Sequence, residues 1–227
     1  MARVRNLTFV AALLAATLGL TSSPAQADHS WGNYHWARSG AVSVNVLDSV
    51  TSNWDGHLST ANNDWNKSQY LDNTVVSSDT TSRIRRRCPK PSGAVRACNY
   101  EYGRNGWLGI ASISVSGGSH ITTGTTKVND SYFNSSPYNT SAWRQFVMCQ
   151  EIGHDWGLDH QDENFSNPNL GTCMDYTSDP GTNQHPNQHD YDQLASIYSH
   201  SDGSASGTGG ASTIRTGNTI TKITWAQ

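Results

Sequence analysis

The stretch "CQEIGHDWGLDHQD", residues 149–162, decides how the rest of this sequence is interpreted. It overlaps a segment, residues 139–157, whose apolar positions recur at the spacing of an amphipathic helix. On a helix, residues four apart share a face, so Gln150 and His154 point to the same side with Glu151 beside them. The helix is therefore expected to present these three polar side chains together.

Gly157 follows at the end of this helical pattern. Glycine adopts the left-handed backbone conformation at little cost, and that conformation ends a helix and turns the chain. His160, three residues further on, can then return to the point reached by Gln150 and His154. The sequence predicts that these three side chains converge on one metal ion and that Glu151 faces the water bound to it.

The segments before this helix are predicted to form a small sheet backed by one helix. Residues 41–50 alternate valines with small or polar residues, as a half-buried strand does, and residues 52–70 have helical spacing. Short strands are expected at 73–78 and 106–117. Residues 119–130 are Thr-rich and weakly apolar, which favours an edge strand over a central one.

The segments after this helix contain little regular structure until residues 187–200, where Asn187 is expected to cap a further helix. We therefore expect one folded domain over residues 28–200. Residues 201–227 form a Gly/Ser/Thr-rich tail that cannot bury a core and is expected to be flexible. Its last residues, "IRTGNTITKITWAQ", alternate again and allow a terminal strand that docks on the domain.

The first 27 residues have the order of a secretory signal. Arg3 and Arg5 precede an apolar run, residues 7–20, and small residues end in Ala25-Gln26-Ala27. The run is short for a membrane span, and no second one follows. We expect cleavage before Asp28 and a secreted, extracellular protein without a membrane anchor.

The charge balance argues against a nucleic-acid partner. The net charge of −3 includes the arginines of the signal segment, so the mature chain is about two units more acidic. The one basic cluster, residues 83–90, is interpreted as a solvated loop. We expect a monomer with a protein or peptide substrate and with neither nucleic acid nor a membrane as partner.

The chain has four cysteines, none of them in a C-x-x-C pair. In an exported protein this pattern indicates two disulfides rather than a metal site. The spacing alone leaves three pairings open.

The residues of the opening stretch resemble a known family, the metzincin metallopeptidases. Their signature is H-E-x-x-H-x-x-G-x-x-H followed by a methionine turn, the Met-turn. Here Gln150-Glu151-x-x-His154-x-x-Gly157-x-x-His160 matches it except at the first ligand, and "GTCMDY", residues 171–176, looks like the Met-turn. The resemblance extends over residues 41–200 in the order of elements, but at specific residues only over 149–176.

The resemblance implies an α+β fold of the metzincin type. Such a fold has a small twisted mixed sheet with a backing helix, an active-site helix, and an irregular lower subdomain that ends in a helix. It also implies a secreted zinc-dependent endopeptidase in which Gln150, His154 and His160 bind Zn²⁺ and Glu151 is the general base. Tyr176 would be an extra ligand or a transition-state donor, and Met174 would lie beneath the metal. An extended substrate would add to the edge strand expected at residues 119–130.

The same resemblance favours one disulfide pairing, Cys88–Cys98 with Cys149–Cys173. Cys149 precedes the first ligand position and Cys173 precedes Met174, so a bond between them would join the active-site helix to the Met-turn. A loop of that length corresponds to ~3.5 kcal/mol in the chain-entropy account.

Gln150 leaves two hypotheses open. An amide oxygen is a weaker donor than imidazole, although equally uncharged, so the change should lower metal affinity rather than abolish binding. One hypothesis is a working zinc peptidase that retains its general base. The alternative is an inactive secreted binding or inhibitory module of the same fold.

Other candidate ligands receive a structural interpretation. His185 and His189 flank Pro186 at an expected helix start. The acidic residues after Gly157 are interpreted as a solvated turn in which Asp162 accepts a hydrogen bond from the His160 region. The remaining histidines considered have no spacing that argues for ligation: His29, His35, His57 and His120.

Overall fold

The structure is a computed structural model, and it describes residues 28–202 and 219–226. The expected signal segment, residues 1–27, and the expected flexible stretch at 203–218 lie outside the described residues.

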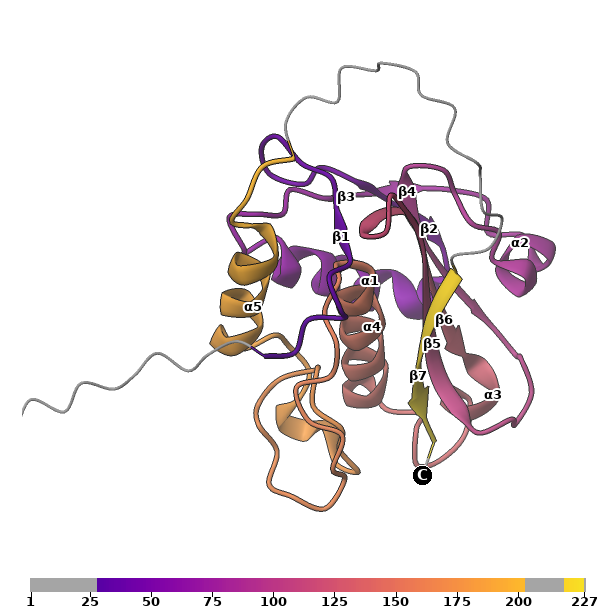
Figure 1. The fold of residues 1–227 in the computed structure, drawn as a ribbon. Coiled ribbons are helices and arrows are strands. Elements are labelled where there is room, and N and C mark those ends of the chain that lie inside the picture. Colours follow the sequence, from indigo (N-terminus) through magenta and orange to yellow (C-terminus); the bar gives the residue numbers. More distant parts are fainter. Residues whose placement is uncertain (1–27, 203–218, 227) are drawn as a thin grey trace, which may run out of the picture.

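Within the described residues, seven strands form one mixed sheet in the order β3-β2-β4-β6-β5-β7, with β1 paired to β6 (Figure 1). Strands β1 to β4 run parallel to their partners, whereas β5 and β7 are antiparallel. The strands are His35–Trp36 (β1), Asn45–Ser49 (β2), Thr74–Ser77 (β3), Ala94–Tyr100 (β4), Trp107–Ser116 (β5), His120–Asn129 (β6) and Thr219–Trp225 (β7).

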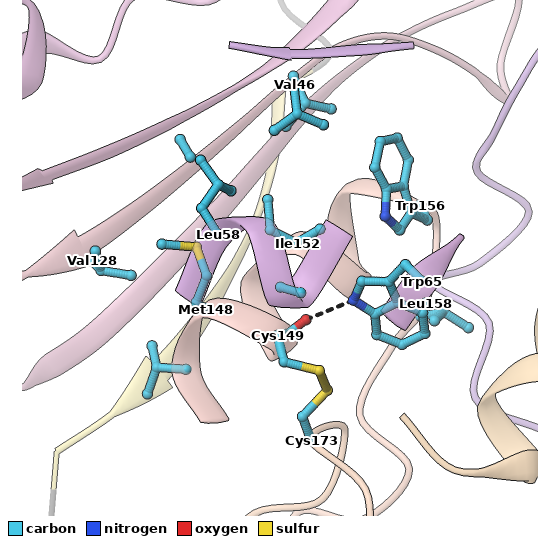
Figure 2. Close-up of a cluster of buried hydrophobic side chains, with 14 of the residues drawn as sticks. Val46, Leu58, Trp65, Val128, Met148, Cys149, Ile152, Trp156, Leu158 and Cys173 are labelled. Atoms are coloured by element: carbon cyan, nitrogen blue, oxygen red, sulfur yellow. Dashed lines mark hydrogen bonds between the residues drawn. A yellow bond between two sulfur atoms is a disulfide. The ribbon is translucent and has the colours of Figure 1, made fainter. Parts of the chain in front are cut away.

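Helices α1 (Ser52–Trp65) and α4 (Ser141–Asp155) lie side by side against the sheet (Figure 1). Their apolar faces form the core with side chains such as Leu58 and Ile152, both fully buried (Figure 2). The indole nitrogen of Trp65 donates to the carbonyl oxygen of Cys149 at 3.0 Å, which ties the two helices together. Short helices α2 (Ser82–Arg87) and α3 (Asp130–Phe133), the 3-10 turn η1 (Pro180–Thr182) and helix α5 (Gln188–Tyr198) complete the described elements.

The fold agrees with the expected combination of a mixed sheet and a few helices, but one strand assignment was wrong. Residues 119–130 do not form an edge strand, because β6 pairs with β4 on one side and β5 on the other. The two most buried threonines of β6 tolerate the interior because their hydroxyls find partners there. Thr126 donates to Asp155 Oδ2 at 2.8 Å, and Thr125 donates to the carbonyl oxygen of Ser112 at 3.3 Å.

Two local predictions also need correction. The basic cluster at 83–90 begins with the short helix α2 rather than a loop, and β4 was not predicted. Arg96 interrupts the run of apolar residues in β4. Its guanidinium donates to the hydroxyl oxygens of Ser49 at 2.6 Å and Ser78 at 3.1 Å. These contacts satisfy a charged side chain in a strand that is otherwise mostly buried.

Both favoured disulfides, Cys88–Cys98 and Cys149–Cys173, are present. The second joins α4 to the segment that contains Met174 (Figure 2). None of the helices in the described ranges is long and apolar enough to cross a membrane.

Candidate metal centre

Helix α4 carries the candidate site on its last two turns. Thr140 caps the helix by accepting a hydrogen bond from the Trp143 N–H at 3.2 Å. Near the other end Gln150, Glu151 and His154 are fully buried. The helix points these polar groups into the protein, so each needs a partner there.

Gly157 turns the chain as its residue type predicted, with φ +90°. A Cβ atom at this position would lie 2.2 Å from the carbonyl oxygen of Tyr34, so a larger residue is excluded by sterics as well as by backbone conformation. The turn returns His160 to His154, and their Nε2 atoms lie 3.0 Å apart.

The two imidazoles present lone pairs to each other. His154 Nδ1 lies 2.8 Å from the carbonyl oxygen of Leu158, and His160 Nδ1 lies 2.9 Å from Glu163 Oε1. Both partners only accept, so each Nδ1 carries the proton and each Nε2 of a neutral ring has a free lone pair. Glu163, rather than the expected Asp162, therefore orients His160.

The two lone pairs repel each other, and protonation of one ring does not readily relieve that repulsion. Burial lowers the pKa of His154 well below its ordinary value, and burial together with the Lys222 cation lowers the pKa of His160 to about 3. A metal cation between the two nitrogens fits these neutral rings, since it accepts both lone pairs.

Glu151 lies beneath β5, where Gly109 leaves room for it. A Cβ atom at Gly109 would be 2.3 Å from Glu151 Oε1. Burial raises the pKa of Glu151 well above its ordinary value, while the hydrogen bond from the Thr224 hydroxyl at 2.5 Å opposes that shift. Glu151 Oε2 has no hydrogen-bond partner among the described residues.

Gln150 uses both ends of its amide. Its Nε2 donates to the carbonyl oxygen of Cys173 at 2.8 Å, and its Oε1 accepts from the Thr224 hydroxyl. The structure thus brings His154 and His160 together and links Gln150 to Cys173 and to β7.

The segment of residues 171–176 lies beside this group. The main chain of Gln161 donates to the carbonyl oxygen of Met174 at 2.6 Å, and Tyr176 N donates to the carbonyl oxygen of Asp162 at 2.9 Å. Met174 is buried against Gly153. The Tyr176 ring lies 4.3 Å from that of His160, so the aromatic side chain borders the candidate centre.

Strand β7 covers the candidate centre. It pairs antiparallel with β5, opposing Ile223 to Ile110 and Thr224 to Gly109. The Tyr176 hydroxyl donates to the carbonyl oxygen of Ile223 at 3.1 Å. Lys222 Nζ lies 2.5 Å from Asp159 Oδ1, which itself accepts from the His160 N–H at 2.7 Å. The alternation in this strand predicted that it could dock, but nothing local indicated where.

The histidines near Pro186 lie outside this centre. His185 Nδ1 contacts Asp64 Oδ2 at 2.6 Å, and the His189 ring stacks on His29 with centroids 4.9 Å apart.

Comparisons with known proteins leave the assignment to the site itself. No family model matches the chain, and no curated protein matches it. One similar solved structure is the crystal structure of myroilysin, with 13% identity, a TM-score of 0.42, and coverage of 76% of this chain and 89% of that one. A second myroilysin structure has 12% identity, a TM-score of 0.43, and coverage of 76% and 99%. Similarity this low assigns neither the family nor the activity.

Proposed function

We propose that the mature chain is a secreted zinc-dependent endopeptidase of the metzincin type. The observation that carries the proposal is the pair of opposed imidazole nitrogens, 3.0 Å apart, on the same helix and turn as the buried Glu151. Zinc–nitrogen bonds of ~2.0–2.1 Å place two ligands of one tetrahedral ion about 3.3–3.4 Å apart. The 3.0 Å spacing of the pair is close to this value.

The zinc would polarise the scissile carbonyl and acidify a water molecule. Glu151 is the proposed general base, since its raised pKa makes it a stronger proton acceptor than an ordinary carboxylate. Tyr176 already donates to the peptide carbonyl of Ile223, so the same hydroxyl is suited to a developing oxyanion.

The position of β7 supports a peptide substrate. It is an extended strand that pairs antiparallel with β5. The carbonyl oxygen of Ile223 contacts Tyr176, and the side chain of the next residue, Thr224, contacts Glu151. We propose that protein or peptide substrates take this place, so that β5 replaces residues 119–130 as the substrate-binding strand. β7 must leave before they bind.

We propose that Gln150, His154 and His160 form the ligand set once β7 has left and the cleft beside β5 is open. Gln150 Oε1 accepts from Thr224 while β7 is docked and becomes available once that strand leaves. Met174 and Gly157 are proposed to support the ligands, through packing against Gly153 and through the turn to His160.

One observation favours the inactive alternative, a secreted binding or inhibitory module. Thr224 contacts both Gln150 and Glu151, so the chain occupies its own candidate machinery. Under this alternative, extended peptides bind in place of β7 and are not cleaved.

The decisive test compares the zinc-loaded mature chain with its Glu151→Gln variant in the cleavage of an unfolded protein. We expect cleavage by the first, with Glu151→Gln ~10²–10⁴-fold slower. Peptide binding without turnover, or cleavage that survives Glu151→Gln, contradicts the proposal.

Export and oligomeric state complete the proposal. Two disulfides suit an oxidising compartment, which agrees with a secretory signal at residues 1–27. We propose a monomer that acts without nucleic acid or membrane.

A further inference from the structure

A second group of metal-ligating side chains lies where β1, the start of β6 and the end of α5 meet. His35 is in β1, His120 begins β6, and His200 and Asp202 follow α5. His35 and His200 are 165 positions apart, which is why no spacing in the sequence indicated this group. None of these side chains takes part in the candidate centre described above.

The ligand atoms of His35, His200 and Asp202 all lie within 4.8 Å of one another, and His120 approaches the same Asp202 oxygen. Asp202 Oδ1 lies 3.2 Å from His200 Nε2, 3.2 Å from His120 Nε2 and 3.5 Å from His35 Nε2. The Nε2 atoms of His35 and His200 are 3.2 Å apart. Around a tetrahedral zinc ion, neighbouring nitrogen and oxygen ligands lie about 3.3–3.5 Å apart.

The hydrogen bonds of the cluster leave a lone pair of His35 facing a carboxylate oxygen, an arrangement that a bound cation would stabilise. His35 Nδ1 lies 2.8 Å from the carbonyl oxygen of Asn33, which only accepts, so Nδ1 carries the proton and Nε2 of the neutral ring has a lone pair. That lone pair faces both a carboxylate oxygen and the Nε2 of His200. The contact with Asp202 is repulsive unless a positive charge lies between the two atoms.

The ligands are held in place by their surroundings. The other carboxylate oxygen, Asp202 Oδ2, accepts from the Arg38 N–H at 2.8 Å, and the Asp202 N–H donates to the carbonyl oxygen of Arg38 at 2.9 Å. These bonds leave Oδ1 free to face the histidines. A fixed carboxylate and an imidazole oriented through its second nitrogen are the usual support of a protein metal site.

We propose that His35, His200 and Asp202 bind a zinc ion separate from the candidate catalytic centre, with His120 positioning the Asp202 carboxylate. Imidazole nitrogen with one carboxylate oxygen suits zinc better than calcium or magnesium, which take oxygen ligands. His200 and His120 are 44% and 38% exposed, so the ion can enter from solvent. Bound there, it would join the N-terminal strand to the chain after α5 and stabilise the fold.

The test is a zinc count on the mature chain, residues 28–227, after zinc loading and desalting. Three variants are compared with it: His35→Ala with His200→Ala, His154→Ala with His160→Ala, and the control His185→Ala, whose partner is Asp64. We expect the first pair to lose one zinc ion, the second pair to retain one, and the control to match the unsubstituted chain. Cobalt loading of the second pair should still give the visible absorption of a four-coordinate ion.

Because the first pair could fail to fold, His120→Gln provides a milder change at a partly exposed position. We expect it to lose zinc to a chelator at least ~10-fold faster, with an unchanged circular dichroism spectrum. A zinc content unaffected by His35→Ala with His200→Ala overturns the proposal. The proposal is also overturned if the chain binds no zinc and is stabilised by acid. A proton on His35 would then supply the positive charge beside Asp202. The count requires no peptidase activity, so its outcome is separate from that of the proposed function.

Discussion

The hydroxyl of Thr224 in the C-terminal strand lies 2.5 Å from the Oε1 atom of Glu151 in α4, 73 positions earlier in the chain. The same hydroxyl contacts Gln150 Oε1. Because a hydroxyl carries one proton, Thr224 donates to only one of these two oxygens at a time. Burial raises the pKa of Glu151 well above its ordinary value. The closed cleft therefore favours the protonated acid, whereas the general base must be ionised.

Loosening β7 should raise peptidase activity. Thr224→Ala removes the hydroxyl that contacts both residues. The hydroxyl donates one hydrogen bond at a time, which contributes about 0.5–1.5 kcal/mol, so we expect cleavage of a peptide ~2- to 13-fold faster at low substrate concentration. Thr221→Ala is the matched control, because Thr221 lies in the same strand but is exposed and contacts Ser112. Equal rates in the two variants would show that β7 does not limit access.

The contact of Lys222 with Asp159 should also hold β7 in place. Lys222→Ala removes an ion pair that is partly buried, with Lys222 24% and Asp159 29% exposed. We expect a smaller gain in activity than for Thr224→Ala, and a gain that shrinks at high salt because salt already screens the ion pair in the unsubstituted chain. The measurement is the cleavage rate of one peptide at low and high salt. A rate unaffected by either substitution contradicts the closed cleft.

Gly109 should tolerate no side chain, because its Cβ would lie 2.3 Å from Glu151 Oε1. We expect Gly109→Ala to lower the free energy of unfolding by ~1–3 kcal/mol and to abolish cleavage by displacing the base. Gly56→Ala is the contrasting change: it is in α1 with nothing within 4 Å of the added atom and should stabilise by ~1 kcal/mol. Denaturant unfolding of both variants measures the difference, and an unchanged Gly109→Ala protein would rule out the close approach of Glu151.

Gln150 should influence metal affinity more than protein stability. We expect Gln150→His to bind zinc more tightly than the unsubstituted chain and Gln150→Ala to bind it less tightly, since imidazole is the stronger donor. Competition with a zinc chelator gives the order of affinities, in the background His35→Ala with His200→Ala so that one centre is measured. Equal affinities in all three chains would remove Gln150 from the ligand set.

The sequence by itself determined the local arrangement of the candidate site. Helical spacing put Gln150, Glu151 and His154 on one helix, and Gly157 supplied the turn to His160, because these effects act within a few residues of backbone. The alternation of apolar residues likewise located most strands, and helical spacing located both long helices. The same rules could not assign β6 to the interior, since a strand is central or at the edge according to what pairs with it.

Only the tertiary structure decided what surrounds that arrangement. The partners of Gln150 and Glu151 come from β7, and the second cluster joins His35 to His200 across 165 positions. Such contacts depend on how the whole chain folds back on the sheet, so no local pattern contains them. The helix and its histidines follow from backbone geometry, whereas access to them depends on long-range pairing of strands whose sequences are merely compatible with it.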